Sequence, residues 1–253
     1  MRYFETRAQR IGWLFVAATA AGVASVLAMS SALNDDDLLA AVSSHQGSLL
    51  VGELLIFLML TAMAGTAVLL HPVLRRRSET LALSYVLARA FEIVILSVGI
   101  VAGLLLLPLS WEHGASGGGG TSSAEVLADS LRSASDWTGY LGAQMVFSMS
   151  ALVLNLAFYR YQLVPRWLSI WGLVGVPMMF ASGVLVMVES LNSSASTLNA
   201  LVVPLAVQEM VMAIWLIARG FSDTHTQPQR SVPDPVGDHA FEEATSAPRF
   251  GDS

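Results

Sequence analysis

Residues 81–109 read LALSYVLARAFEIVILSVGIVAGLLLLPL, and this apolar stretch decides the class of fold. The hydrocarbon core of a bilayer is about 30 Å thick, which about 20 helical residues span. The stretch is longer than that, and its only charged residues are Arg89 and Glu92. Apolar and polar residues do not alternate along it, as they do in the strands of a membrane barrel. Because backbone groups in lipid must hydrogen-bond internally, the stretch predicts a transmembrane helix.

Five further stretches of the chain have the same character. The six predicted spans are residues 11–33, 48–71, 81–109, 137–159, 167–188 and 198–219. The composition agrees, since 54% of the residues are hydrophobic and 13% are charged, against about 25% charged residues in soluble domains. We therefore expect an all-α integral membrane protein, with one domain over residues 1–220 in which six transmembrane helices pack as a bundle.

The first span has a second interpretation, as a cleaved signal peptide. Basic residues, an apolar run and the small residues at 30–32 follow one another in the order of such a peptide. However, the run is longer than the usual apolar region of about 7–15 residues. Ala17, Ala21 and Ser25 also recur at every fourth residue, as in a packed membrane helix. We expect the span to be retained, and a mature protein beginning near Leu33 would contradict the six-span prediction.

The placement of arginine predicts the orientation in the membrane. Nine arginines flank the spans on one side: Arg2, Arg7, Arg10, Arg75, Arg76, Arg77, Arg160, Arg166 and Arg219. The loops on the other side hold several acidic residues, among them Asp35, Asp36, Asp37, Glu112, Glu125, Asp129 and Asp136, and a single arginine, Arg132. Cytoplasmic loops carry the excess of basic residues, and an even number of spans leaves both ends on one side. We expect a multi-pass protein of the plasma membrane with both termini in the cytoplasm.

The predicted loops contain two short helices, and the chain ends in a polar tail. Ser122-x-x-Glu125 is a capping box, which predicts a short amphipathic helix lying on the outer membrane interface. A second short helix is expected to start near the acidic run at 35–37. After Gly220 the chain becomes polar and rich in proline, which predicts a disordered cytoplasmic tail over residues 221–253.

Composition excludes several classes of function. The chain has no cysteine, which excludes disulfides, thiolate metal sites and cysteine nucleophiles. No basic tract indicates a nucleic-acid partner. The acidic residues at 35–37 are adjacent and would not face one another on a helix, while His45, His71 and His113 do not stand at facing depths for haem. We therefore predict no metal site and no cofactor.

Four ionisable residues fall inside the predicted spans. They are Glu53, Arg89, Glu92 and Glu209, and each costs about 2.5–3.5 kcal/mol to insert. Arg89 and Glu92 share a helix face with the motif at 99–103, Gly-x-x-x-Gly, which lets a neighbouring helix approach closely. Counting about 1.5 Å per residue places Arg89 about 12 Å and Glu92 about 16 Å from the inner surface, and Glu209 about 16 Å from the outer surface. These three should meet near the midplane, whereas Glu53 lies about 8 Å from the outer surface.

The intramembrane polar residues (Arg89, Glu92, Glu209, Gln208 and Glu53) have three interpretations. They are a structural cluster in a membrane scaffold or regulatory subunit, a site for a proton, a cation or a small polar solute as in secondary transporters, or the acid–base group of a membrane-embedded enzyme acting on a lipid or quinone. Three acids face one base, so the charges do not cancel unless a carboxyl group carries a proton. We take the second interpretation as the working hypothesis, with Glu209 as the titrating group, Arg89 as its counter-charge and Glu92 orienting Arg89. The bilayer is the predicted partner, and the oligomeric state stays open.

The connection between the fourth and fifth spans, LVPRWLSIWGL at 163–173, predicts an interfacial anchor. Pro165 suits the first turn of a helix. Arg166 is expected to lie at the lipid phosphates, with Trp167 and Trp171 in the aromatic belt.

This connection also carries a family resemblance. Together with HPVL at 71–74, RAFE at 89–92 and QEMV at 208–211, it resembles a bacterial membrane protein family catalogued as domain of unknown function 4386. The resemblance covers about residues 7–221. It implies a multi-pass membrane protein whose intramembrane charged residues lie in family motifs, and it implies no activity.

Overall fold

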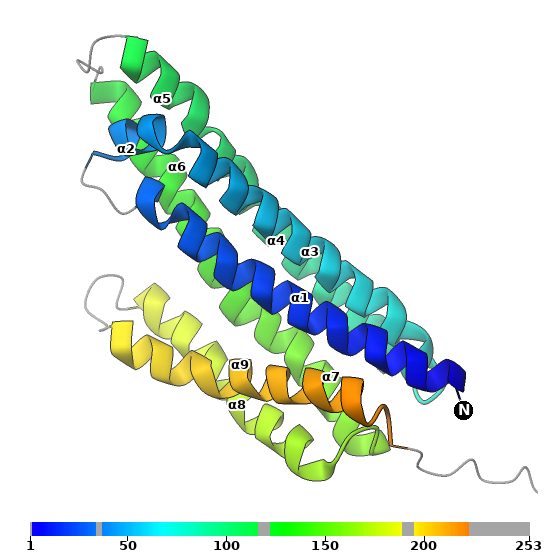
Figure 1. Ribbon diagram of the computed structural model, residues 1–253. Helices are drawn as coiled ribbons and strands as arrows, with labels where there is room; N and C mark the ends of the chain where they lie inside the picture. The colour runs from blue at the N-terminus through cyan, green and yellow to red at the C-terminus, as the bar shows by residue number, and fades with distance from the viewer. Residues whose placement is uncertain (1, 34–36, 116–121, 189–194, 223–253) are drawn as a thin grey trace, which may run out of the picture. The chain divides into compact units, whose positions relative to one another are not determined.

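The structure is a computed structural model that describes residues 2–33, 37–115, 122–188 and 195–222, and every regular element in these ranges is a helix (Figure 1). The helices are α1 (Arg2–Leu33), α2 (Leu38–Ser44), α3 (Gln46–Arg75), α4 (Glu79–Leu104), α5 (Leu106–Ala115), α6 (Ser122–Tyr140), the π-helical segment η1 (Leu141–Val146), α7 (Phe147–Tyr161), α8 (Arg166–Val188) and α9 (Ala195–Ala218). The tail predicted to be disordered lies outside the described residues.

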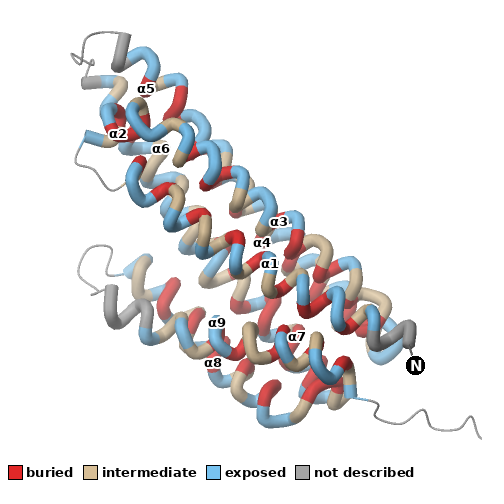
Figure 2. The backbone as a smooth tube through the Cα atoms, viewed as in Figure 1, coloured by how far each residue is buried: buried red, intermediate tan, exposed pale blue. Residues whose placement is uncertain are grey.

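Six helical stretches are long and apolar enough to cross a membrane. They are Thr6–Leu33, Gln46–Arg75, Glu79–Glu112, Ser123–Tyr161, Arg166–Val188 and Ala200–Ala218. The predicted all-α class with six spanning helices is therefore confirmed. Figure 2 shows exposed residues along the outer faces of the helices. Many of them are large and apolar, among them Val26, Leu54 and Leu87. A surface of this kind suits lipid as the solvent.

Side-chain caps set the starts of two helices. Ser78 precedes α4, and its hydroxyl accepts a hydrogen bond from the Leu81 amide at 3.3 Å. Asp37 precedes α2, and its carboxylate accepts from the Ala40 amide at 3.0 Å. Both side chains satisfy amides that have no partner within the helix. The short helix expected near the acidic run is therefore present, and Asp37 caps it.

The helix predicted to lie separately on the outer interface is instead continuous with the fourth span. It begins at Ser122, but α6 runs through η1 and α7 to Tyr161 without a loop. The sequence between these residues contains no proline to stop a helix. At about 1.5 Å per residue the stretch is about 58 Å long, roughly twice the hydrocarbon core. One end of it therefore extends beyond that core, where α6 packs with α2, α4 and α5.

The buried core is shared by all six spans at one end and divided at the other. At the end of α3 that carries Arg75, one hydrophobic cluster contains residues from every span, including Ile11, Tyr85 and Leu216. Further along, one cluster joins α1, α3 and α4, and a separate cluster joins α7, α8 and α9. The apolar clusters beyond the common core are therefore separate, although the fourth span still packs against α4 through α6 and η1.

The glycine motif of α4 allows close approach on two sides. Gly99 and Gly103 are buried on the same face as Arg89, as the sequence predicted. A Cβ atom added at Gly99 would clash with Thr138 of α6, and one at Gly103 would clash with the Glu53 carboxyl group of α3. Each missing side chain therefore makes room for a different neighbouring helix.

Candidate functional site

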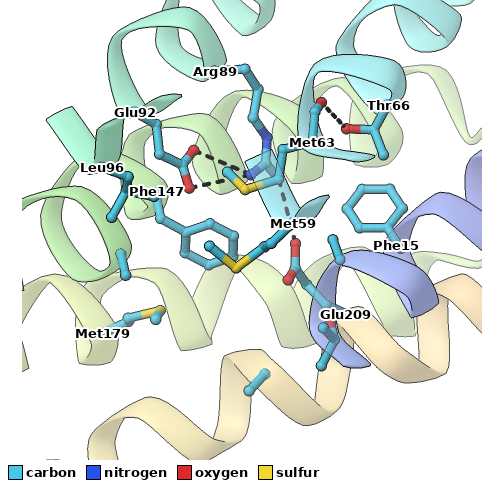
Figure 3. A pocket seen from close by; sticks show the side chains of 14 residues that line it. Phe15, Met59, Met63, Thr66, Arg89, Glu92, Leu96, Phe147, Met179 and Glu209 are labelled. Atoms are coloured by element: carbon cyan, nitrogen blue, oxygen red, sulfur yellow. Dashed lines mark hydrogen bonds and ion pairs between the residues drawn. The ribbon is translucent and has the colours of Figure 1, made fainter. Parts of the chain in front are cut away.

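Arg89 is the centre of an ionisable cluster that joins two distant helices. Its Nη1 lies 3.1 Å from Oε2 of Glu92, one turn along α4, and its Nη2 lies 3.6 Å from Oε1 of Glu209 on α9 (Figure 3). The side chains of Arg89 and Glu92 are 2% exposed, whereas that of Glu209 is 13% exposed. Arg89, Glu92 and Glu209, which the sequence predicted to lie at a similar depth in the membrane, are therefore adjacent in the structure.

Neutral groups complete the surroundings of Arg89 and Glu92. Arg89 Nε donates a hydrogen bond to the Tyr85 hydroxyl at 3.2 Å, and the Ser150 hydroxyl of α7 donates to Glu92 Oε2 at 3.1 Å. The guanidinium carbon also lies 5.2 Å from the centre of the Phe147 ring, within cation–π range. All three nitrogens of Arg89 therefore contact an oxygen, as a buried guanidinium requires.

The cluster borders a cavity that all six spans line. The cavity has a volume of about 180 Å³. Its walls are mainly apolar, and Phe15 of α1, Met59 of α3, Phe147 of α7 and Met179 of α8 contribute to them (Figure 3). Glu209 lines it from α9, and Arg89 and Glu92 line it from α4. Small apolar cavities with a few converging polar groups are the usual form of ligand sites.

A π-helical turn positions the wall that the fourth span contributes. Segment η1 spans Leu141–Val146, and Ala143 in it and Phe147 just after it line the cavity. A π turn inserts an extra residue and so rotates the helix that follows, and such turns are frequent at functional sites. Gln144 of η1 accepts a hydrogen bond from the Ser182 hydroxyl of α8 at 3.0 Å, which ties the turn to that helix.

Gln208 is not part of this cluster, although it precedes Glu209. Its Nε2 donates to Asn155 Oδ1 of α7 at 3.1 Å and to the Leu168 carbonyl of α8 at 3.2 Å. Consecutive residues on a helix point about 100° apart, so the two side chains face different neighbours. Asn155 itself lies against Gly172, where a side chain would clash with it. Gln208 therefore joins α7, α8 and α9 through a second, uncharged polar contact.

Glu53 also lies apart from the Arg89 cluster. Its carboxyl group contacts Gly103 of α4. Gly103 lies eleven residues after Glu92, which corresponds to about 16 Å along the helix. The residue is 3% exposed, and neither carboxyl oxygen has a hydrogen-bond partner among the described residues. The chain therefore holds two separate buried acidic sites.

The three residues of the predicted interfacial anchor lie at the start of α8. Arg166 is exposed, Trp167 is 51% exposed, and Trp171 is half-buried against the common core. The two indole ring centres are 6.4 Å apart. Contact with lipid headgroups stays a prediction for them.

Sequence reasoning missed the neutral members of the site. Tyr85 lies four residues before Arg89, a spacing that places both on one helix face and could have identified it. Phe15, Phe147 and Ser150 come from other helices, and only the packing of the bundle brings them to the cluster. Among the residues that the structure describes, no group of three histidine, aspartate or glutamate side chains could hold a metal ion.

These features define the class of protein: a multi-pass helical membrane protein with an ionisable cluster beside a partly open cavity. The family model described as a domain of unknown function, DUF4386, matches residues 11–220, and the chain belongs to this family. No curated protein and no solved structure matches the chain.

Proposed function

We propose that this protein takes up a proton or a small polar solute at Glu209, near the midplane of the plasma membrane, and links it to transport. The observation that carries the proposal is the cavity of about 180 Å³ lined by all six spans, with the Glu209 carboxyl group in its wall. The cavity is partly open, and a mostly apolar pocket with a few polar groups in its wall is typical of a ligand site.

The charge balance of the cluster supports a role for Glu209 rather than for Glu92. With both carboxyl groups ionised, Arg89 leaves the cluster with one negative charge. Glu92 shares hydrogen bonds with Arg89 and Ser150, and its side chain is 2% exposed. Glu209 is held by one ion pair of 3.6 Å and is 13% exposed. In this proposal Glu209 gains and loses the proton, Arg89 is its fixed counter-charge, and Glu92 orients Arg89.

The two rival functions receive less support from the same geometry. A scaffold accounts for the ion pairs but not for the cavity beside them. An enzyme acting on a lipid or quinone would use Glu209 as its acid or base, but the cavity of about 180 Å³ encloses little more than one ring. A scaffold assigns no use to the accessible edge of Glu209.

Infrared difference spectroscopy on the purified protein tests whether Glu209 titrates. As the pH is lowered, the carbonyl band of a protonated carboxyl group should appear in the wild type and be missing in Glu209→Gln. Glu53→Gln is the matched control, since it removes a buried carboxyl group outside the cavity, and it should keep the Glu209 band. An unchanged band in Glu209→Gln would contradict the proposal.

The orientation is part of this proposal, and the absence of cysteine makes it simple to test. Thr80 and Ser133 are exposed at opposite ends of the spans. In intact cells a membrane-impermeant maleimide should label Ser133→Cys at once and Thr80→Cys only after permeabilisation. The reverse pattern would place the termini outside.

A further inference from the structure

We propose that the cavity beside Glu209 binds a small organic cation, an amine with one compact apolar group, and that the amine and a proton compete for the Glu209 carboxylate. This inference rests on the proposed function and adds the class of solute. The charge, the size and the lining of the cavity support it.

The charge of the site favours a cation over an anion. Arg89 is the only basic residue that lines the cavity, and it already faces Glu92, Glu209 and the Tyr85 hydroxyl. An anion would have to displace a carboxylate from it and would raise the net negative charge of the cluster. An ammonium group beside Glu209 instead brings the net charge to zero. A buried charge needs such a partner because its desolvation is expensive.

The size and the lining of the cavity determine what the apolar part of the amine can be. A cavity of roughly 150 Å³ holds benzene, so the present cavity of about 180 Å³ has room for one ring or a short branched alkyl group. Met59, Met63 and Met179 supply polarisable thioether sulfurs that adapt to apolar ligands. Phe15 lies on the other side of the Arg89–Glu209 ion pair from Phe147 in the view of Figure 3 and offers a ring near the place of the ammonium group.

The walls also offer few alternative partners for the amine. The Thr66 hydroxyl donates to the Met63 carbonyl at 2.7 Å, and its oxygen can accept from the amine only as a neutral partner, which is weaker than a carboxylate. The charged groups that face Glu209 are Arg89 and Glu92, both from α4. The Tyr85 hydroxyl contacts Arg89. The residues that line the cavity from α1, α3, η1, α7 and α8 carry no titratable side chain. Glu209 is therefore the group on which the amine and the proton compete.

Competition for one carboxylate has a defined pH dependence. While Glu209 is protonated, each amine cation that binds must release one proton, so the apparent dissociation constant should rise about tenfold for each pH unit of acidification. Once Glu209 is ionised, binding releases no proton and becomes independent of pH.

Calorimetry on the full chain in detergent tests the inference with three probes that share one ring. Benzylammonium is the cation, benzyl alcohol the neutral analogue and benzoate the anion. Benzylammonium should bind at least about tenfold more tightly than either analogue, because benzyl alcohol brings no positive charge to balance Glu209 and benzoate adds a further negative charge. A pH-indicator dye in weak buffer should record the released proton.

Three variants locate the site. Glu209→Gln should weaken benzylammonium binding at least about tenfold and abolish proton release. Ala206→Phe fills the cavity without removing a charge, and it should also abolish binding, so the test does not depend on Glu209→Gln alone. Glu53→Gln should bind as the wild type does.

The outcomes separate this inference from the proposed function. If benzoate or benzyl alcohol binds as well as benzylammonium, or if Ala206→Phe leaves binding intact, the inference is wrong. If Glu209 titrates in the infrared spectrum but no amine binds, the solute class fails and the proton site stands. If Glu209 neither titrates nor affects binding, both fail.

Discussion

The two buried acidic sites are built in opposite ways. Glu92 and Glu209 share the Arg89 guanidinium and a cavity, and Glu92 also accepts a hydrogen bond from Ser150. Glu53 contacts the bare backbone of Gly103, and its oxygens have no partner among the described residues. Burial is common to both sites, so burial alone does not indicate function. A counter-charge and open space beside the carboxyl group distinguish the site that can exchange a ligand.

The largest effect on stability should come from removing the counter-charge. Arg89→Gln leaves two buried carboxyl groups without a base and should lower the free energy of unfolding by about 3–5 kcal/mol. Thermal unfolding in mild detergent measures the loss. Arg132→Gln is the control, because the Arg132–Asp136 pair is partly exposed and should contribute less than about 1 kcal/mol. Equal losses in the two variants would contradict a structural role for Arg89.

A smaller loss of stability is expected from a substitution at the contact between Glu53 and α4. Gly103→Ala adds a methyl group that overlaps the Glu53 carboxyl group and should destabilise the protein by about 1–3 kcal/mol. Adding Glu53→Ala should recover most of the loss, which a double-mutant cycle would measure as coupling. Gly139→Ala is the control, since nothing lies within contact of a Cβ there. Additive losses would show that the two residues do not touch.

The smallest expected effect is a gain in protein stability when Glu53 is replaced. Glu53→Met keeps the length of the side chain and removes two oxygens without partners, so it should stabilise the protein by about 1 kcal/mol. Glu92→Met should be destabilising, because Arg89 and Ser150 lose their shared acceptor. A loss of stability in Glu53→Met would mean that its carboxyl group has a structural partner.

Sequence alone predicted the spans because lipid imposes a length and a composition on each helix. The uniform rise of a helix also allowed the sequence to predict a similar depth in the membrane for Arg89, Glu92 and Glu209. Depth does not give direction around the helix axis. Gln208 and Glu209 lie at one depth, yet Gln208 contacts Asn155 and Glu209 contacts Arg89. The sequence grouped them because the packing that separates them was not visible in it.

The fourth span shows a second limit of prediction from the sequence. The capping box at Ser122 predicted where a helix starts, but not that this helix continues to Tyr161. A capping box fixes only the first turn, and the end depends on a breaker or on packing. The π turn at Leu141–Val146 lies where the helix contacts both α4 and α8, and no residue pattern marks it.

The stability of Glu209→Gln at neutral pH tests the central claim most directly. This variant leaves Arg89 balanced by Glu92, so the account predicts a melting temperature close to that of the wild type or above it. Such a result would mean that the protein keeps the Glu209 carboxyl group for a use other than folding. A loss as large as that of Arg89→Gln, about 3–5 kcal/mol, would contradict the account and make Glu209 a structural partner of Arg89.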